Sequence, residues 1–376
     1  MRTNASVIIA TANRAADLHE TLENLARIHR PGTVELIVVD NCSTDDTRQV
    51  VDHAVAWYPF PVRYLFEQEE GKYAALNAGI KAARGAVIAA TDDDARFEPD
   101  WLERAVDGLR NHECEFVGGR VLPIWRGPKP PWLNERSGLH AKVIAILDHG
   151  TAVREFGRGI SWPLGVNVAY RREVFDRLGL FDNRLGRKTG TLRNQAQREW
   201  HLRARAFGAR GFYLPDMVVH HLVAAARLEK QYFRRWLYWH GISRALLFKH
   251  GGFDMEEPEL EPPPHAGERS IAGVPLHLFA KARRSAGAFA WHALNGRVGT
   301  AFDHELWLCF FAGIVRQRWA DRRQPVDAGP SMVQTHEIAS LPQAPAPFAG
   351  DRIDIETYAL PSAREEIVSP KAQPLA

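Results

Sequence analysis

The sequence predicts an α/β protein built on a doubly wound, mostly parallel sheet flanked by helices. Between residues 6 and 121, short apolar runs alternate with amphipathic stretches of helical spacing, which is the rhythm of parallel strands joined by crossover helices. The chain has 376 residues, 45% of them hydrophobic, which is enough apolar material to bury a large core. We therefore expect one sheet to organise the N-terminal part, with a helical extension after it.

The N-terminal elements follow one another in a regular order. The predicted strands cover residues 6–10, 34–40, 62–66, 86–94 and 116–122, and the clearest helical segments between them cover 16–28 and 73–85. In a parallel sheet the carboxyl ends of the strands share one edge, and ligands bind there. Asp40 and the Asp92–Asp94 triplet close two of these strands, so we expect both on one rim of the sheet.

The rest of the chain has a different character. Pro- and Trp-rich loop material is expected over about 122–170, and the C-terminal tail has a Pro/Ala-rich composition typical of disorder. The other predicted segments are helices at 167–182, 194–207, 227–250 and 272–319, short strands at 211–215 and 216–223, and a Pro/Glu-rich linker at 256–266. The predicted parts are a domain over 1–223 with halves 1–121 and 122–223, a helical extension over 224–323 and a tail over 324–376.

Composition excludes several classes of protein. A formal charge of +3, from 48 basic and 45 acidic side chains, is too balanced for a nucleic-acid-binding chain, so no nucleic-acid partner is expected. The three cysteines are far apart and form no C-x-x-C pair, which argues against a disulfide framework or a structural zinc site. No long apolar leader follows Met1. These features predict a cytoplasmic protein.

The triplet Asp92–Asp94 is the strongest local signal of chemistry. Three successive carboxylates at the end of an apolar strand repel one another unless something neutralises them, and a divalent metal does so. Oxygen ligands on a turn suit Mg²⁺ or Mn²⁺, which fill their other positions with phosphate and water. The first strand is followed by "TANRA", without the glycines of a dinucleotide-binding loop, so a nucleotide here would have its phosphates neutralised by a metal on these aspartates.

Several blocks of the sequence, in order, resemble the family 2 glycosyltransferases with the GT-A fold. They are "SVIIATANR", "VELIVVDNCSTDDT", "EGKYAALNAGIKAARG", "IAATDDDARFEPDWL", "FVGGRVLP", "GVNVAYRREVFDRLGLFDNRLG" and "FYLPDMVVHHLV". The resemblance covers roughly residues 5–223. It implies a nucleotide-sugar-dependent transferase, and the long helix at 227–250 also looks like the extension of bacterial relatives.

The resemblance implies roles for residues on the donor side. Thr11, Asn13 and Asp40 would line the nucleotide pocket, with Asp40 reading the base. Lys72 would lie beside the nucleotide or its phosphates. Within the triplet, Asp92 and Asp93 would contact the nucleotide sugar, Asp92 also belonging to the metal shell, and Asp94 would be the direct metal ligand. His221 would lie near the diphosphate and the metal. As an alternative, His221 is a structural histidine at a strand end.

On the acceptor side, the resemblance points to Trp162, Asn167 and Arg171. An indole can stack on a sugar ring and an amide can orient hydroxyl groups. An alternative for Arg171 is a charge at the start of a helix, with no contact to substrate. These three residues are our candidates for acceptor binding.

The general base is where the sequence departs from the family pattern. An inverting displacement at a hydroxyl needs a base, and relatives carry a Glu-Asp or Glu-Glu pair in the helix after "FDNRLG", where this chain has Ala196 and Gln197. The nearest carboxylate is Glu199, which lies about 200° further round a helix and has Arg203 at i+4 as an alternative partner. Three readings stay open: Glu199 is a relocated base, Asp148 or Asp182 serves, or transfer has been lost.

Two segments indicate contact with a membrane. The helix predicted over 227–250 has aromatic residues on one face and basic residues opposite, which is typical of helices on anionic membranes, although the same face can pack on the domain. The apolar run at 306–315 is about 15 Å long as a helix, half of what a bilayer core requires, so we expect a buried or interfacial helix there.

The sequence therefore predicts an inverting glycosyltransferase that moves a sugar from a nucleotide-diphosphate donor to an acceptor hydroxyl. Its cofactor would be Mn²⁺ or Mg²⁺, and its acceptor a glycan or a lipid-linked molecule in polysaccharide or glycolipid assembly. Peripheral contact with the inner membrane surface is expected. The alternative is a catalytically impaired relative that binds a nucleotide sugar or glycan as a scaffold, because of Ala196 and Gln197.

Overall fold

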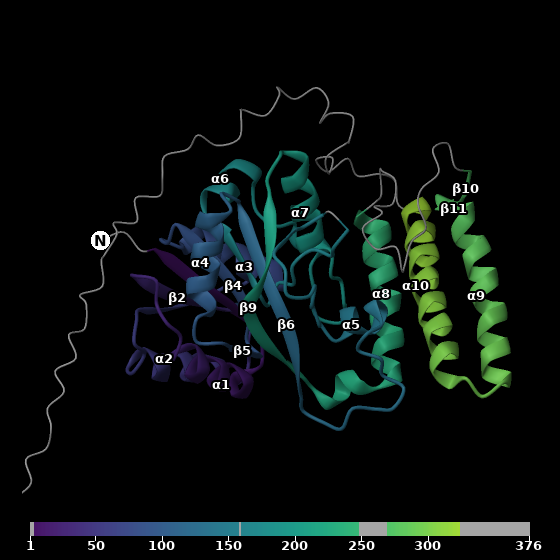
Figure 1. The fold of residues 1–376 in the computed structure, drawn as a ribbon, viewed down its shortest axis with the longest axis horizontal. Helices are drawn as coiled ribbons and strands as arrows, with labels where there is room; N and C mark the ends of the chain where they lie inside the picture. The colour runs from purple at the N-terminus through teal and green to yellow at the C-terminus, as the bar shows by residue number, and fades with distance from the viewer. Residues whose placement is uncertain (1–3, 158, 248–268, 324–376) are drawn as a thin grey trace, which may run out of the picture. The chain divides into compact units, whose positions relative to one another are not determined.

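The computed structural model describes residues 4–157, 159–247 and 269–323 (Figure 1). Within them, nine strands form one sheet in the order β3-β2-β1-β4-β8-β6-β9-β5, and β7 pairs with β9. The first four strands are β1 (Ala5–Thr11), β2 (Val34–Asp40), β3 (Val62–Phe66) and β4 (Val87–Asp92), all parallel to their neighbours in this group. The predicted linker at 256–266 and tail beyond 324 lie outside the described residues.

The second half of the sheet is mixed in direction. Its strands are β5 (Ala95–Phe97), β6 (Phe116–Trp125), β7 (Arg154–Glu155), β8 (Val168–Arg171) and β9 (Gly211–Val223). Strand β8 runs antiparallel to both β4 and β6, whereas β6 and β9 are parallel. The two short strands expected at 211–215 and 216–223 are one strand, β9, whose register with β6 shifts next to Gly119.

The helix expected over 167–182 is wrong in its first half. Residues Val168–Arg171 form β8, and only Glu173–Leu178 form a helix, α6. Val168, Ala169 and Tyr170 are all buried because strands lie on both sides and both faces of the sheet are covered here. A strand buried on both faces has no alternation of polar and apolar residues, so its sequence is as compatible with a helix as with a strand.

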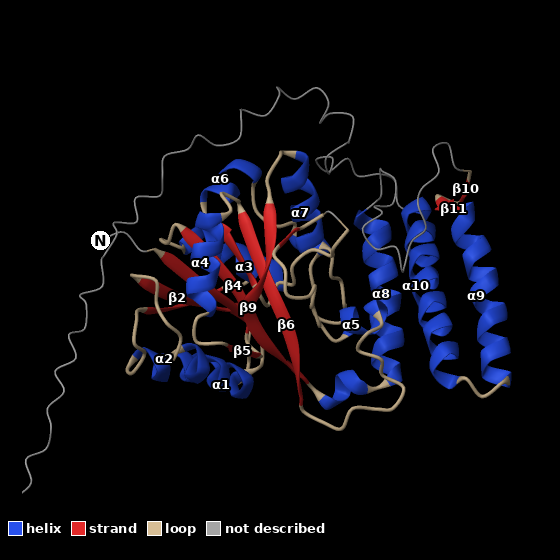
Figure 2. Cartoon of the chain, viewed as in Figure 1, coloured by secondary structure: helices blue, strands red, loops and turns tan. Residues whose placement is uncertain are grey.

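Helices cover both faces of the sheet (Figure 2). The helices of this part are α1 (Ala15–Leu25), α2 (Thr47–Val55), α3 (Lys72–Ala82), α4 (Trp101–Asn111), α6 and α7 (Ala196–Ala206). On one face, Ile8 and Phe116 share a core with Leu76 of α3 and Trp200 of α7. On the other face, α4 approaches Val117 at Gly108, where no side chain separates them. The sheet is thus held between two helical layers, and its rim stays open for a site.

A layer of long helices follows the sheet. They are α8 (Lys230–Leu247), α9 (Leu276–Leu294) and α10 (Val298–Arg323), preceded in the chain by the short α5 (Gly138–Val143); a hairpin of β10 (Ser270–Ile271) and β11 (Val274–Pro275) leads into α9. The single helix expected over 272–319 is interrupted at Gly296, whose φ of +70° favours glycine. The aromatic residue Phe233 of α8 is buried against Phe302 of α10. The apolar face of α8 therefore packs inside the protein.

Helix α10 is longer than the apolar run at 306–315 suggested. Of the described residues, Val298–Arg322 form one helix long and apolar enough to cross a membrane by length and composition, with 39% of its most apolar window buried in the protein. The core helices of soluble proteins pass the same test. In this structure α10 packs between α8 and α9.

The crossing of α8 and α10 predicts opposite effects for two glycine substitutions. An ideal Cβ at Gly241 of α8 would lie 2.0 Å from the carbonyl oxygen of Phe310, whereas a Cβ at Gly287 of α9 would meet nothing within 4 Å. We expect Gly241→Ala to lower the free energy of unfolding by about 1–3 kcal/mol, because the helices must separate. Gly287→Ala should raise it by about 0.5–1 kcal/mol through helix propensity. Urea unfolding monitored by fluorescence measures both, and equal effects would contradict the close crossing.

Candidate functional site

Three parallel strands end side by side at one rim of the sheet. The register pairs Thr11 of β1 with Asp40 of β2, and Ala10 with Asp92 of β4. The rim predicted from the sequence is therefore present. After β4 the chain turns through Asp93 and Asp94 into β5, and both of these side chains are buried.

The charges of the aspartate turn are balanced within the protein. Arg14 Nη1 lies 2.8 Å from Asp94 Oδ2 and 3.1 Å from Asp93 Oδ1, and the Thr11 hydroxyl donates to Asp93 Oδ2 at 2.7 Å. Lys72 forms an ion pair with Asp92. Burial, assisted by the charge of Asp94 and opposed by Arg14, raises the pKa of Asp93 to about 7. Proton binding by Asp93 reduces the repulsion among the three neighbouring carboxylates.

The pKa of Asp94 shifts in the opposite direction. Burial disfavours its charge, but His221, Arg14 and Arg227 together hold the pKa of Asp94 well below its usual range. His221 Nε2 lies 3.4 Å from Asp94 Oδ1, and that oxygen is buried without a hydrogen-bond partner. Arg227 lies beside both, with Nη1 3.2 Å from His221 Nε2 and Nη2 3.7 Å from Asp94 Oδ2.

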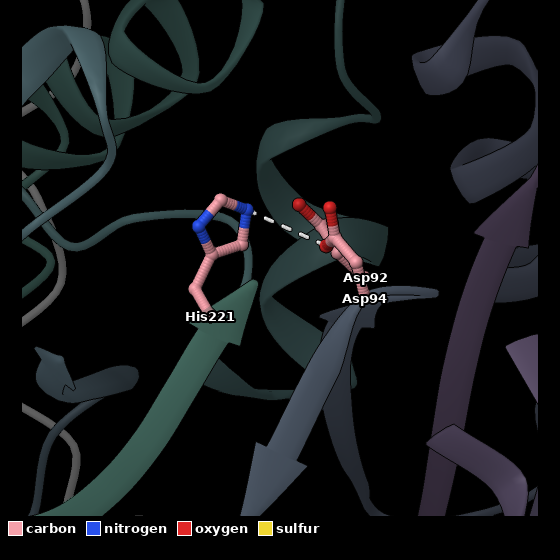
Figure 3. Close-up of side chains that lie close together, drawn as sticks. All are labelled: Asp92, Asp94 and His221. Atoms are coloured by element: carbon pink, nitrogen blue, oxygen red, sulfur yellow. Dashed lines mark ion pairs between the residues drawn. The ribbon is translucent and has the colours of Figure 1, made fainter. Parts of the chain in front are cut away.

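These groups have the composition of a site for a hard divalent cation. One ligand atom from each of Asp92, Asp94 and His221 lies within 4.8 Å of the others. Figure 3 shows the imidazole of His221, near the end of β9, pointing toward the carboxylates of Asp92, the last residue of β4, and Asp94, in the turn after it. An ionised, buried oxygen that lacks a donor is costly unless a cation meets it, and Mn²⁺ and Mg²⁺ accept carboxylate oxygens. The residues therefore fit such a metal.

Two cavities meet at this turn. A rim cavity of about 750 Å³ is lined by Thr11, Asn13, Arg14 and the Asp92–Asp94 turn, and a large cavity of about 1280 Å³ is lined by Trp162, Gln197, His201 and Asp148, among others. Both cavities are lined by Lys72, Asp92, Arg187, Leu192, Arg227 and Tyr232. The two cavities therefore adjoin beside Asp92 and Lys72.

The large cavity is rich in cationic side chains. Among the described residues, eight Lys or Arg side chains line it against three Asp or Glu side chains. The basic residues are Lys72, Arg136, Lys142, Arg154, Arg187, Arg193, Arg198 and Arg227; the acidic ones are Asp92, Glu135 and Asp148. All three acidic side chains are already paired: Asp92 with Lys72, Glu135 with Lys129 at 2.6 Å, and Asp148 with Arg120 at 3.3 Å. This lining favours an anionic occupant.

The candidates for nucleotide binding divide into two groups. Thr11, Asn13, Lys72 and the aspartate turn line the rim cavity. Asp40 lies on the same rim but is buried, and its oxygens accept from the Ser43 backbone N–H at 2.9 Å and from the Tyr64 hydroxyl at 2.8 Å. In this structure Asp40 does not belong to the cavity lining, because the chain's own donors occupy it.

The candidates for acceptor binding also divide. Trp162 lines the large cavity and stacks on His201, with ring centroids 5.2 Å apart. Asn167 is fully buried; its Oδ1 accepts from Trp101 Nε1, and its Nδ2 donates to the carbonyls of Arg120 and Met217, each at 2.8 Å.

Arg171 lies elsewhere too. Its guanidinium donates to the carbonyls of Cys114 and Leu109 near the end of α4. Neither Asn167 nor Arg171 lines the rim cavity or the large cavity. Their polar atoms serve the packing of β8, since buried polar groups must find partners.

The residues considered for the general base are also separated. Gln197 lines the large cavity, with Nε2 3.3 Å from the Tyr170 hydroxyl. Glu199 lies outside both linings, and its carboxylate accepts from Arg203 at 2.9 Å. Asp182 is likewise outside and pairs with Arg184 at 2.7 Å. Of the carboxylates named from the sequence for this role, the structure brings only Asp148 to the large cavity.

Sequence reasoning missed two cations of the site. Arg14 contacts two members of the aspartate turn, and Arg227 lies beside Asp94 and His221. A signal for Arg14 was present, because it follows the first strand and three buried carboxylates require cations nearby. No signal in the sequence identified Arg227, since its position depends on the turn after β9.

Two comparisons of the sequence with known proteins point to one family. Residues 6–179 match the family model described as glycosyl transferase family 2. The chain is 28% identical over 249 residues to a glucosyl-dolichyl phosphate glucuronosyltransferase of Haloferax volcanii, covering 64% of this chain and 76% of that protein. It is 28% identical over 171 residues to a dolichol-phosphate mannosyltransferase of Pyrococcus furiosus, covering 46% of this chain and 47% of that protein.

A solved structure shares the fold. It is a mannosyltransferase from Pyrobaculum calidifontis in complex with GDP-Man and Mn²⁺, with a TM-score of 0.57, 20% sequence identity and coverage of 85% of this chain and 88% of that chain. At this identity the likeness extends to the fold alone. It supports the predicted fold class, a helix-flanked, mostly parallel sheet followed by a helical extension.

His201 predicts a pH dependence of stability. This histidine is fully buried behind Trp162, and burial, with Arg198 nearby, lowers its pKa from 6.5 to about 3. The unfolded chain therefore binds a proton at His201 below pH 6.5 that the folded chain does not, so stability falls as the pH falls. Between pH 7 and pH 5 this group should cost about 2 kcal/mol, at about 1.4 kcal/mol per pH unit.

The check is the difference in unfolding free energy between pH 7 and pH 5 in His201→Phe. We expect that difference to shrink by about 2 kcal/mol relative to the unsubstituted protein. His53→Phe, at an exposed position of α2, is the matched control and should leave the difference unchanged. An unchanged pH dependence in His201→Phe would show that the buried imidazole is not held neutral.

Proposed function

Because the chain belongs to glycosyl transferase family 2, we propose that it transfers one sugar from a nucleoside-diphosphate donor to an acceptor with inversion at the anomeric carbon. The acceptor oxygen attacks the anomeric carbon while the bond to the diphosphate breaks, and the diphosphate leaves with the electron pair. The observation that carries this proposal is the meeting of the two cavities at Asp92 and Lys72. The donor occupies the rim cavity and the acceptor the large cavity.

The aspartate turn suits the leaving diphosphate. We assign Asp94, with Asp92 and His221, to a divalent metal, Mn²⁺ or Mg²⁺, which when bound supplies positive charge to the leaving group. Lys72 and Arg227 line both cavities and carry positive charge at the same place. Thr11 and Asn13 border the rim cavity where the rest of the nucleotide would lie. Oriented charges at a developing anion lower the barrier most when they are fixed in advance.

The acceptor side favours an oxygen that is already ionised. Gln197 stands where relatives place a carboxylate base, and an amide cannot take a proton at neutral pH. A phosphate oxygen is anionic without a base, and the eight cationic side chains around the large cavity suit it. We therefore propose a lipid phosphate as acceptor, in polysaccharide or glycolipid assembly. The name of one relative, a dolichol-phosphate mannosyltransferase, supports this choice. The name of another, a glucosyl-dolichyl phosphate glucuronosyltransferase, supports only a lipid-linked acceptor, because that lipid phosphate already carries a sugar.

A second candidate function rests on the same residue. Gln197 and Ala196 are also what a chain that has lost transfer would carry, and such a protein would bind a nucleotide sugar or glycan as a scaffold. The two functions differ in one outcome. A scaffold is silent with every donor and acceptor until Gln197→Glu restores a base.

The metal assignment predicts the effect of Asp94→Asn, which keeps the shape of the side chain and removes its charge. We expect nucleoside diphosphate release in the presence of Mn²⁺ to fall about 100-fold or more. The matched control is Asp17→Asn, because Asp17 also pairs with Arg14, at 2.7 Å, but lies outside both cavity linings. Equal activity in Asp94→Asn and the unsubstituted protein would exclude the metal role.

The acceptor assignment predicts a choice between two lipids of equal chain length. With a panel of sugar nucleotides and Mn²⁺, a polyprenyl phosphate should receive the sugar and the free polyprenol should not, because only the phosphate is ionised. Product formation is measured by chromatography of the lipid. Transfer to a hydroxyl acceptor that is abolished in Asp148→Asn would overturn the proposal, since it would identify Asp148 as a base.

A further inference from the structure

Helix α9 has an exposed outer side and an apolar end. Along its 19 residues only Leu278 and Ser285 are buried. Figure 1 shows α8, α10 and α9 standing side by side, with α9 at the edge of this row. At the connection to α10, Trp291 is 65% exposed, Leu294 87% and Val298 57%. We call the exposed segment Ala290–Val298 the α9–α10 tip.

Helix α9 and the tip together carry a basic charge pattern, to which the tip itself contributes Arg297. From residue 269 to residue 302 the chain has five Lys or Arg residues and no Asp or Glu. Arg283, Arg284 and Arg297 are exposed on this segment. A large indole with aliphatic neighbours and flanking basic residues, without any acidic residue, matches the interface of an anionic lipid bilayer. A second copy of the same surface would repel it because both carry the same charge.

The tip lies at the end of the helical layer where α8 begins. Tyr232, near the start of α8, lines both of them. Next to it, Lys230 Nζ lies 4.9 Å from the ring centroid of Phe302, and Arg234 pairs with Glu305 at 2.7 Å. Phe302 is one turn of α10 beyond Val298. The start of α8 and the start of α10 are therefore adjacent.

We propose that the α9–α10 tip docks the protein on an anionic membrane, with Trp291 and Leu294 in the headgroup region and the basic residues on the lipid phosphates. This surface differs from the one expected from the sequence, the aromatic face of α8, where Tyr232 and Trp236 line the large cavity. That the docking presents the cavities to a lipid acceptor rests on the proposed function. The docking itself requires no transfer.

The test is co-sedimentation of the full chain with vesicles in the absence of donor and acceptor. The expected result is binding to phosphatidylglycerol-containing vesicles that weakens between 50 mM and 500 mM salt, with little binding to pure phosphatidylcholine. Trp291→Ser combined with Leu294→Ser should lower the partition coefficient at least tenfold. Trp57→Ser is the matched control, because Trp57 is also exposed, at 40%, but lies at the end of α2.

Two outcomes would overturn the proposal. One is equal vesicle binding by the unsubstituted protein and the double variant. The other is a protein that does not bind vesicles and is dimeric in analytical ultracentrifugation, with a monomeric double variant, which would assign the tip to a contact between copies. Since Trp291 and Leu294 are exposed, the variants should keep the unfolding midpoint of the parent. A variant that loses vesicle binding but still binds nucleotide bears on the docking alone. A variant that loses nucleotide binding but still binds vesicles bears on the proposed function alone.

Discussion

The site is organised by the way the protein holds three carboxylates together at the end of one buried strand. Side by side and without partners they would destabilise the fold, because like charges in a poorly solvated place repel strongly. The structure gives each carboxylate a different environment: Asp92 pairs with Lys72, burial raises the pKa of Asp93, and the neighbouring His221, Arg14 and Arg227 hold the pKa of Asp94 well below its usual range. Arg14 contacts the last two and joins them into one unit.

This division leaves one buried oxygen, Asp94 Oδ1, facing His221 without a hydrogen-bond donor. The two cavities meet beside this oxygen, at residues that line both. The site thus combines a place for a cation, a ring of basic side chains and two adjoining spaces. Each feature is ordinary alone, and together they support a displacement at a phosphate-bearing sugar. The mixed half of the sheet contributes His221 at the end of β9, so the site needs both halves.

The sequence was sufficient for the rim and insufficient for what surrounds it. Asp40 and the Asp92–Asp94 turn were placed correctly because strand direction and strand ends can be read from apolar runs. Asn167 and Arg171 were expected at the acceptor, yet the structure uses their donors inside the fold. The sequence shows which polar residue stands in a motif, but it does not show which groups on neighbouring strands form hydrogen bonds with that residue. The same holds for α8, whose aromatic face is expected at a membrane from the sequence, whereas Tyr232 and Trp236 line the large cavity.

The central claim is that the aspartate turn and its neighbouring cations bind a nucleoside diphosphate with a divalent metal. Calorimetric titration of the purified protein with UDP, GDP and dTDP, each with and without Mn²⁺, tests it most directly. The account predicts binding of one nucleotide that strengthens markedly when Mn²⁺ is present, which would also identify the donor class. Nucleotide binding of equal strength with and without Mn²⁺, or no binding of any of the three, would contradict it.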